Sequence, residues 1–425
     1  MARLLLLSIL AIVLSACSGS DEKKPTVAAV FTPGSCEVGI FGTNQSFVAI
    51  TRRDTTFRYS FSDGHWGEID SSARVECGDG SLRIDGSTII DGRPVQITNT
   101  MFKAQGATLA GQLLEPESAN SATPLVVLAH GSEELGWIEA ASYPYQLVGR
   151  GVSVFVYDKR GTGKSSGDYS QNFPQLADDL VAASQEAKRL AGSRFQRFGL
   201  LGFSQGGWIV PMAAERSDVD FIGIGYGLVV DILEEDAAQV ALELREAGYG
   251  DEVIAAATEI TDVTARLAVS QYQDGLEELD ALRGRYGNKP WFSLIRGGFT
   301  GVILGLPTDQ LRSKGIPMFD RLNIDWSIKP MDVLREVNVP QLWALAENDR
   351  EAPISTTLSR LQTLRKDGKD ISVFVFPNTD HGMWEYEQMP DGTRRYVRVT
   401  NRYYDLMADW AKGALQPPYA TSIQR

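Results

Sequence analysis

One serine of this chain stands where its hydroxyl could act as a nucleophile. Ser204 is the centre of Gly-Phe-Ser-Gln-Gly at residues 202–206, with an apolar run before it and a helix-compatible run after it. A serine on such a sharp strand-to-helix turn needs small residues two positions before and after it, because strand and helix approach closely there. With 41 glycines in the chain, the pattern alone could arise by chance. The flanking strand and helix favour a nucleophile.

A serine hydroxyl needs a base to take its proton, usually a histidine held by a carboxylate. The chain has 3 histidines. His65 lies in an N-terminal β-rich stretch and His130 ends a strand well before the serine, whereas His381 follows the last expected strand. Because the carboxyl ends of parallel strands carry catalytic loops to one edge of a sheet, His381 is the expected base.

The carboxylate that orients this histidine is expected between serine and histidine in the chain. Asp349 follows an apolar strand at residues 341–346 and precedes Pro353. Glu347 is a rival two positions earlier, and Asp380 is a weaker one, because adjacent residues rarely point towards each other. We favour Asp349, since turn residues precede it and the proline follows it.

Acyl transfer through this serine would also need two backbone N–H groups to stabilise a tetrahedral oxyanion. Gln205, directly after the serine, is the first expected donor. An apolar strand at residues 125–129 ends in His130-Gly131-Ser132, and Ser132 is the expected second donor. His130 is expected to hold this loop by a side-chain hydrogen bond.

Two other chemistries are disfavoured. The run GTGKS at residues 161–165 resembles the end of a phosphate-binding loop, but that template requires glycine where the chain has Asp158. Three scattered histidines without a C-x-x-C pair argue against a zinc site. The predicted chemistry uses no metal.

Alternating strands and helices begin near residue 108 and must position these groups. The alternation predicts an α/β fold with a mostly parallel sheet and helices on both faces, with its core at residues 101–230 and 326–415. The expected strands are 125–129, 152–157, 198–202, 221–226, 341–346 and 371–376, and helices include 173–190 and 206–216.

Residues 231–325 interrupt this alternation with helical stretches at 236–247, 251–273 and 276–285. They form an insertion between two strands. Its end is rich in aromatic residues, Trp291, Phe292, Phe299, Phe319 and Trp326. Two interpretations stay open: a helical lid over an apolar pocket, or a peripheral helical pack with its own core.

Residues 36–100 are expected to form a small antiparallel β module. Short alternating strands at 47–50, 56–61 and 81–84 are separated by Asp-Gly pairs at 63–64, 79–80 and 91–92, which are typical of hairpin turns. Cys36 and Cys77 lie in this module. A disulfide between them is favoured over two buried thiols, given the leader described next.

The N-terminus resembles a secretory leader. Arg3 precedes an apolar run at residues 4–14, and Leu-Ser-Ala-Cys follows at 14–17. This is similar to the lipobox of bacterial lipoproteins, which implies a signal peptide at 1–16, a lipid on Cys17 and a tether at 17–35. The expected location is the bacterial cell envelope, anchored to a membrane on its extracytoplasmic side. Ordinary secretory cleavage is the alternative.

The charge balance limits the partners. The formal net charge is −13, so the surface would repel nucleic acid. After residue 20, no apolar run reaches the length of a membrane-spanning helix. The membrane contact predicted by the leader is therefore through a lipid.

Taken together, these residues resemble the α/β-hydrolase superfamily over about residues 105–415. The runs LAGQL (109–113), HGS (130–132), YDKRGTGKS (157–165) and GFSQGG (202–207) are similar to bacterial esterases related to the serine aminopeptidase and proline iminopeptidase group. The resemblance implies an α/β-hydrolase fold and a serine esterase that hydrolyses small carboxylic esters without a cofactor. It also implies a structural role for residues 158–165. One departure is Ser132, where many relatives carry another glycine.

Two other functions stay open. A serine aminopeptidase would need a carboxylate to pair with the ammonium group of its substrate, and Glu133, Glu134, Glu234 and Glu235 are candidates. The third possibility is a catalytically silent, lipid-anchored binding protein.

Overall fold

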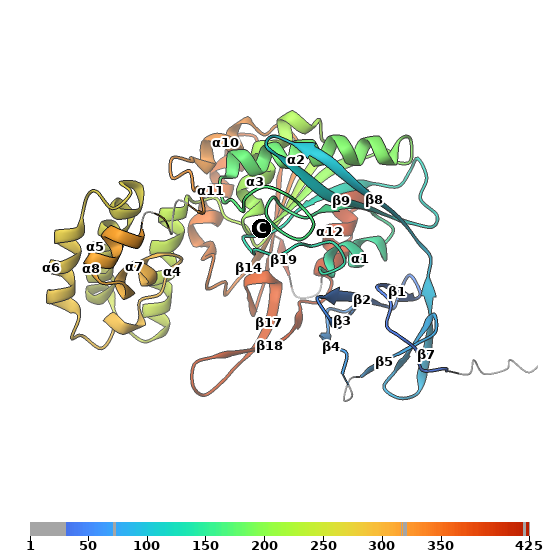
Figure 1. Ribbon diagram of the computed structural model, residues 1–425, viewed down its shortest axis with the longest axis horizontal. Coiled ribbons are helices and arrows are strands. Elements are labelled where there is room, and N and C mark those ends of the chain that lie inside the picture. The colour runs from blue at the N-terminus through green and yellow to red at the C-terminus, as the bar shows by residue number, and fades with distance from the viewer. Residues whose placement is uncertain (1–30, 71–73, 316, 318–320, 420–421, 425) are drawn as a thin grey trace, which may run out of the picture.

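The computed structural model describes residues 31–70, 74–315, 317, 321–419 and 422–424. These residues form a nine-stranded sheet with helices on both faces, a seven-stranded N-terminal sheet, a three-stranded sheet and a helical lobe (Figure 1). The expected signal peptide, Cys17 and the tether up to residue 30 lie outside the described residues.

The nine-stranded sheet contains all the strands expected to carry the site. Its order is β19-β15-β14-β13-β12-β10-β11-β9-β8. The parallel strands are β10 (Leu125–Ala129), β11 (Ser153–Tyr157), β12 (Phe198–Phe203), β13 (Phe221–Gly225), β14 (Gln341–Ala346) and β15 (Ile371–Phe376). Antiparallel strands at the edges are β8 (Val95–Ala104), β9 (Ala107–Pro116) and β19 (Ile423–Gln424). The parallel strands predicted from apolar runs are thus confirmed.

Successive residues of the central strands enter two different cores. In β10, Leu125 and Val127 pack into one cluster and Val126 and Leu128 into another. This follows from the two-residue period of a strand. The first cluster contains side chains of α2 (Phe173–Ala191), α3 (Gly206–Ala214), α10 (Pro330–Glu336) and α11 (Ile354–Lys366). The second contains those of α1 (Tyr143–Val148) and α12 (Tyr403–Lys412). Burial on both faces explains why these strands are continuously apolar.

The insertion between β13 and β14 is a helical lobe, coloured yellow-green to orange in Figure 1. It contains α4 (Ile232–Glu246), α5 (Asp251–Val269), α6 (Leu276–Tyr286), α7 (Thr300–Gly305) and α8 (Thr308–Gln310). Asp231 and Glu234 form a capping box that begins α4. Apolar side chains of the lobe pack into a hydrophobic core of their own. A separate core is one of the two features expected of the insertion.

The N-terminal module is antiparallel throughout, as expected. Its strands are β1 (Gly39–Gly42), β2 (Phe47–Arg53), β3 (Thr56–Phe61), β4 (Trp66–Glu68), β5 (Val75–Gly78), β6 (Ser81–Ile84) and β7 (Thr88–Arg93). The turn expected at Asp91-Gly92 is wrong, because both residues lie inside β7. Gly92 pairs with Phe41 of β1, and a Cβ on Gly92 would lie 3.3 Å from the carbonyl oxygen of Gly80 and 3.5 Å from the Phe41 ring. The turn is at Asp85-Gly86, both with positive φ.

Two boundaries differ from those expected. β8 begins at Val95 and pairs with β9 over its whole length, so the nine-stranded sheet starts inside the range assigned to the β module. At the other end, β19 pairs with β15 beyond residue 415. Edge strands alternate apolar and polar residues, and this weaker pattern resembles that of the neighbouring module.

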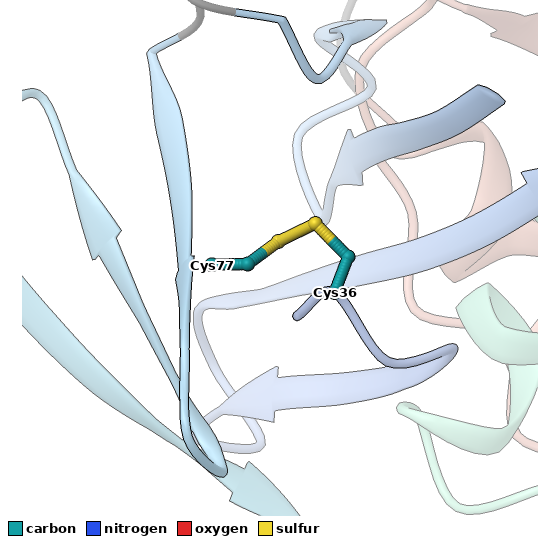
Figure 2. The surroundings of a disulfide bond; sticks show 2 residues. All are labelled: Cys36 and Cys77. Atoms are coloured by element: carbon teal, nitrogen blue, oxygen red, sulfur yellow. A yellow bond between two sulfur atoms is a disulfide. The ribbon is translucent and has the colours of Figure 1, made fainter. Parts of the chain in front are cut away.

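Cys36 and Cys77 form a disulfide that ties the segment before β1 to β5 (Figure 2). The two cysteines are 41 residues apart in the chain. Closing a loop of this length restricts the unfolded chain, which stabilises the folded module by about 3–4 kcal/mol.

A small sheet of β16 (Thr379–Asp380), β17 (Trp384–Gln388) and β18 (Arg394–Val399) follows β15. It contacts the N-terminal module through a backbone bridge between His65 and Arg398 and through the rings of Trp66 and Trp384. Within the described ranges, no helix has the length and apolar character needed to cross a bilayer.

Candidate active site

Ser204 occupies the sharp turn between β12 and α3. Its φ of 51° lies in the left-handed region, which is strained for a residue with a side chain. A Cβ on Gly202 would lie 2.4 Å from the carbonyl oxygen of Gly206, and one on Gly206 would lie 2.5 Å from that of Ala129. The two glycines are therefore needed so that strand and helix can approach, as the spacing predicted.

His381 and Asp349 lie beside this serine. The Nε2 atom of His381 is 3.0 Å from Oγ of Ser204, and its Nδ1 atom is 2.9 Å from Oδ2 of Asp349. Asp349 follows β14 and His381 follows β15, so adjacent parallel strands deliver both side chains to one edge. Asp349 is buried and also accepts a hydrogen bond from the Ala352 amide at 2.7 Å. The structure brings together the three residues selected from the sequence.

The rival carboxylates do not face the imidazole. Glu347 is exposed. Asp380 accepts a hydrogen bond from the backbone N–H of His381 at 2.8 Å, and its other oxygen binds Arg394 at 2.6 Å and the Tyr396 hydroxyl at 2.9 Å. Asp380 thus holds the backbone of the histidine loop while its side chain is turned towards β18.

The imidazole is surrounded by carboxylates. Burial alone would lower the pKa of His381, but Asp349, Glu351 and Glu235 together raise this pKa to about 9. The Glu351 carboxylate is 3.3 Å from Nε2. Negative charge around the ring favours the imidazolium form.

The two expected oxyanion donors line the same cavity as the serine. Gln205 directly precedes α3, and Ser132 lines the same cavity as Ser204. A Cβ on Gly131 would lie only 3.5 Å from that of Ser204, so this loop packs directly against the serine. Among the described residues, neither the Gln205 nor the Ser132 N–H has an acceptor. His130 holds the loop through a 3.1 Å contact with Glu133.

A cavity of about 400 Å³ opens above these groups. Its apolar wall comprises Phe173, Trp208, Ile232, Phe299, Leu322, Ile324 and Trp326. Phe299 belongs to the insertion and Trp326 directly follows it, whereas Trp291 packs within the lobe and Phe319 lies outside the described residues. Both interpretations of the insertion therefore hold in part. The insertion has its own core, and residues of α4 together with residues 297–299 line the cavity. A larger cavity of about 530 Å³ beside β2 contains none of the three residues.

Three of the four candidate glutamates are engaged elsewhere. Glu133 binds His130 and the Trp137 indole, Glu134 binds Arg321, and Glu234 binds Arg360. Glu235, on α4, lines the cavity, and its carboxylate has no partner among the residues with described positions. Burial, with the nearby Glu351 and Asp349, raises its pKa to about 8. Sequence alone could not separate these four residues.

Sequence reasoning also missed Arg394 on β18. Its guanidinium donates to the Asn348 carbonyl at 2.6 Å, next to Asp349, and to Glu246 of α4 at 3.1 Å. Arg350 binds the same glutamate at 2.6 Å. The lobe is thus tied to the loop that carries the buried carboxylate.

For the described part of the chain, no three or more His, Cys, Asp or Glu side chains are grouped so that they could hold a metal ion.

A strained serine lies at the turn between a parallel strand and a helix, and a carboxylate and a histidine follow two later strands of the same sheet. This arrangement defines the class as α/β proteins with a nucleophile elbow. The model of the alpha/beta hydrolase family matches residues 126–395, more than half of the chain. The chain therefore belongs to the alpha/beta hydrolase family and has its fold.

Solved structures include similar proteins at low identity. The Pyrococcus furiosus esterase Pf2001 is 14% identical over 68% of this chain and 83% of its own, with a TM-score of 0.43. The Pyrococcus horikoshii acylaminoacyl peptidase is 14% identical over 82% of this chain, with a TM-score of 0.43. The match covers 46% of that peptidase, so this chain spans less than half of its length. A sequence comparison with curated proteins gives no match.

Proposed function

We propose that this protein is a serine hydrolase that cleaves small carboxylic esters through an acyl-enzyme on Ser204. The observation that carries the proposal is the chain of hydrogen-bond distances from Ser204 Oγ through His381 to Asp349, at the floor of a cavity. Family membership supports hydrolysis.

Each group then has a role. Ser204 Oγ attacks the ester carbonyl while His381 takes its proton, and Asp349 stabilises the imidazolium. The N–H groups of Gln205 and Ser132 receive the oxyanion. The alcohol leaves with the proton from His381, and water, activated by the same ring, releases the acid and regenerates the serine.

A fluorophosphonate probe tests this function together with the silent-binder alternative. We expect the parent protein to be labelled at Ser204, identified by mass spectrometry of the tryptic peptide, and to hydrolyse nitrophenyl esters. A folded parent that neither takes the label nor hydrolyses any ester or anilide would favour a binding protein.

An aminopeptidase is the second candidate function, and Glu235 is the observation that favours it. An unpartnered carboxylate in the cavity could pair with a substrate ammonium group. Under the leading proposal, nitrophenyl esters are hydrolysed faster than aminoacyl nitroanilides. The reverse order would replace the ester function by the peptidase function.

Glu235→Gln is expected to reduce the preference for cationic substrates. For two esters of equal length, one ending in an ammonium group and one in a methyl group, we expect the ratio of their kcat/KM values to fall by about 10-fold or more at about pH 9, where the Glu235 carboxylate is charged, because the charge pair is lost. Glu252→Gln, an exposed glutamate of the same lobe, is the matched control. An unchanged ratio would show that Glu235 does not bind the substrate ammonium.

The activity is expected to rise with pH through the alkaline range. His381 must be neutral to take a proton, and its pKa is raised to about 9 by the surrounding carboxylates. The same shift affects the stability of the fold. Because the pKa of His381 lies above its unfolded value, protonated His381 stabilises the folded protein below about pH 6.5, and this stabilisation is lost as pH rises through about 9.

The measurement is the pH profile of kcat/KM for a neutral ester from about pH 6 to about pH 10. Glu351→Gln should move the midpoint to lower pH, since this carboxylate raises the pKa of His381. A profile that is already flat at neutral pH would contradict the prediction.

We also propose that the chain is a lipoprotein of the bacterial cell envelope, facing the extracytoplasmic side. The Leu-Ser-Ala-Cys run at residues 14–17 supports a lipid on Cys17, and the disulfide between Cys36 and Cys77 is compatible with an oxidising compartment. Cys17→Ser is expected to abolish incorporation of labelled palmitate and to move the protein from the membrane to the soluble fraction. Retention of label in this variant would contradict the proposal.

A further inference from the structure

Lys159 places a buried ammonium group against the loop of residues 130–132. Lys159 comes two residues after the end of β11 and is only 2% exposed. Its Nζ atom donates to the carbonyl oxygen of Gly131 at 2.5 Å and lies 5.3 Å from the centre of the Tyr169 ring. Within the described part of the chain, no carboxylate forms an ion pair with it. A buried charge without an ion-pair partner is costly, so its position calls for a reason other than stability.

The neighbouring residues in the loop have structural partners. Asp158 accepts hydrogen bonds from the backbone N–H groups of Ile138 and Lys164, at 3.1 and 2.9 Å. Arg160 binds both carboxylate oxygens of buried Asp179, at 2.7 and 2.6 Å. These contacts fit the bracing role that the resemblance implied for the segment. Lys159 differs from them, because its hydrogen bond leads to the loop that packs against Ser204.

That hydrogen bond controls the direction of the neighbouring amide. The C=O of Gly131 and the N–H of Ser132 belong to one planar trans peptide, in which the two bonds point in opposite directions. Because the Lys159 ammonium group binds the Gly131 oxygen, the Ser132 N–H points away from Lys159. The next carbonyl, that of Ser132, accepts a hydrogen bond from the Tyr169 hydroxyl, so the following peptide is held too.

We infer that Lys159 is a positioning residue that directs the Ser132 N–H at the oxyanion, an inference that rests on the proposed hydrolase function. The ammonium also polarises the Gly131–Ser132 peptide, which makes its N–H a stronger donor. Burial lowers the pKa of the Lys159 ammonium group to about 8, although the nearby Glu133 and Glu134 carboxylates favour its charged form. Lys159 itself does not touch the substrate.

The test compares Lys159→Met with Lys164→Met. The first keeps the length of the side chain and removes the charge and the donor; the second makes the same change at an exposed lysine of the same loop. We expect Lys159→Met to lower kcat/KM by about 100-fold, with KM changed by less than about 3-fold, because one oxyanion donor is misplaced. The affinity for a trifluoromethyl ketone, whose adduct carries the oxyanion, should fall by a similar factor. Lys164→Met should match the parent.

A parent-like kcat/KM in folded Lys159→Met would overturn the inference, as would a loss confined to KM. If this variant does not fold, Lys159→Gln, which removes the charge and shortens the reach to the Gly131 carbonyl, decides instead: we expect weaker binding of the trifluoromethyl ketone at unchanged KM, and parental binding would overturn the inference. The hydrolase proposal fails separately, when the parent protein itself is neither labelled nor active. A labelled, active parent with a fully active Lys159→Met variant refutes only the role of Lys159.

Discussion

Ser204→Ala is expected to lower kcat for ester hydrolysis by at least about 10⁴-fold, because it removes the atom that would attack the carbonyl. The fold should persist. The turn is held by main-chain hydrogen bonds, from the Ser204 N–H to Gly225 and from the Gly207 N–H to Ser204, and alanine retains both. Steady-state hydrolysis of a nitrophenyl ester measures the loss, and covalent labelling by a fluorophosphonate should disappear with it.

Ser359→Ala is the matched control for this variant. Ser359 is an exposed residue of α11 that does not line the cavity, so its removal should change the rate by less than about 2-fold. If Ser204→Ala kept more than about 1% of the parental rate, the nucleophile would be a different group.

Asp349→Asn should have the second largest effect, a loss of about 10⁴-fold in kcat. Both oxygens of the carboxylate lie near Nδ1 of His381, at 2.9 and 3.1 Å, and an amide cannot stabilise the imidazolium that forms during attack. The substitution keeps the shape of the side chain and an acceptor for the Ala352 amide. Because Asp349 raises the pKa of His381, the variant should also reach its reduced plateau at lower pH than the parent.

Glu347→Gln distinguishes this carboxylate from its rival in the same loop. Glu347 is exposed, so we expect this variant to stay within about 2-fold of the parent. A large loss in Glu347→Gln beside a small one in Asp349→Asn would show that Glu347 is the acid.

The helical lobe contacts the candidate active site at two places. Glu246, at the end of α4, binds Arg350 and Arg394, which flank the loop of Asp349. Glu235, on the same helix, lies in the cavity. A movement of α4 would therefore change both the charge near His381 and the support of the loop that carries Asp349.

Much of this molecule could be predicted from local patterns. Buried parallel strands are apolar on both faces, so the strands from β10 to β15 could be located within one or two residues. The glycines around Ser204 mark the turn by their spacing, because only small residues fit there. His381 followed from the small number of histidines and from the order of the chain. Edge strands such as β8 have a weaker pattern, so the expected boundary of the β module at residue 100 falls inside β8.

Other features depend on contacts between residues far apart in the chain, and only the tertiary structure decided them. Glu234 and Glu235 are adjacent, yet one binds Arg360 and the other faces the cavity. Nothing local distinguishes them, because the difference lies in which side of α4 meets α11. Lys159 likewise stands in a segment with a bracing role, and its bond to Gly131 exists because β10 and β11 lie side by side. The sequence by itself thus determined where the parallel strands lie along the chain and which serine stands at the turn before α3, whereas packing determined which charged groups surround that serine.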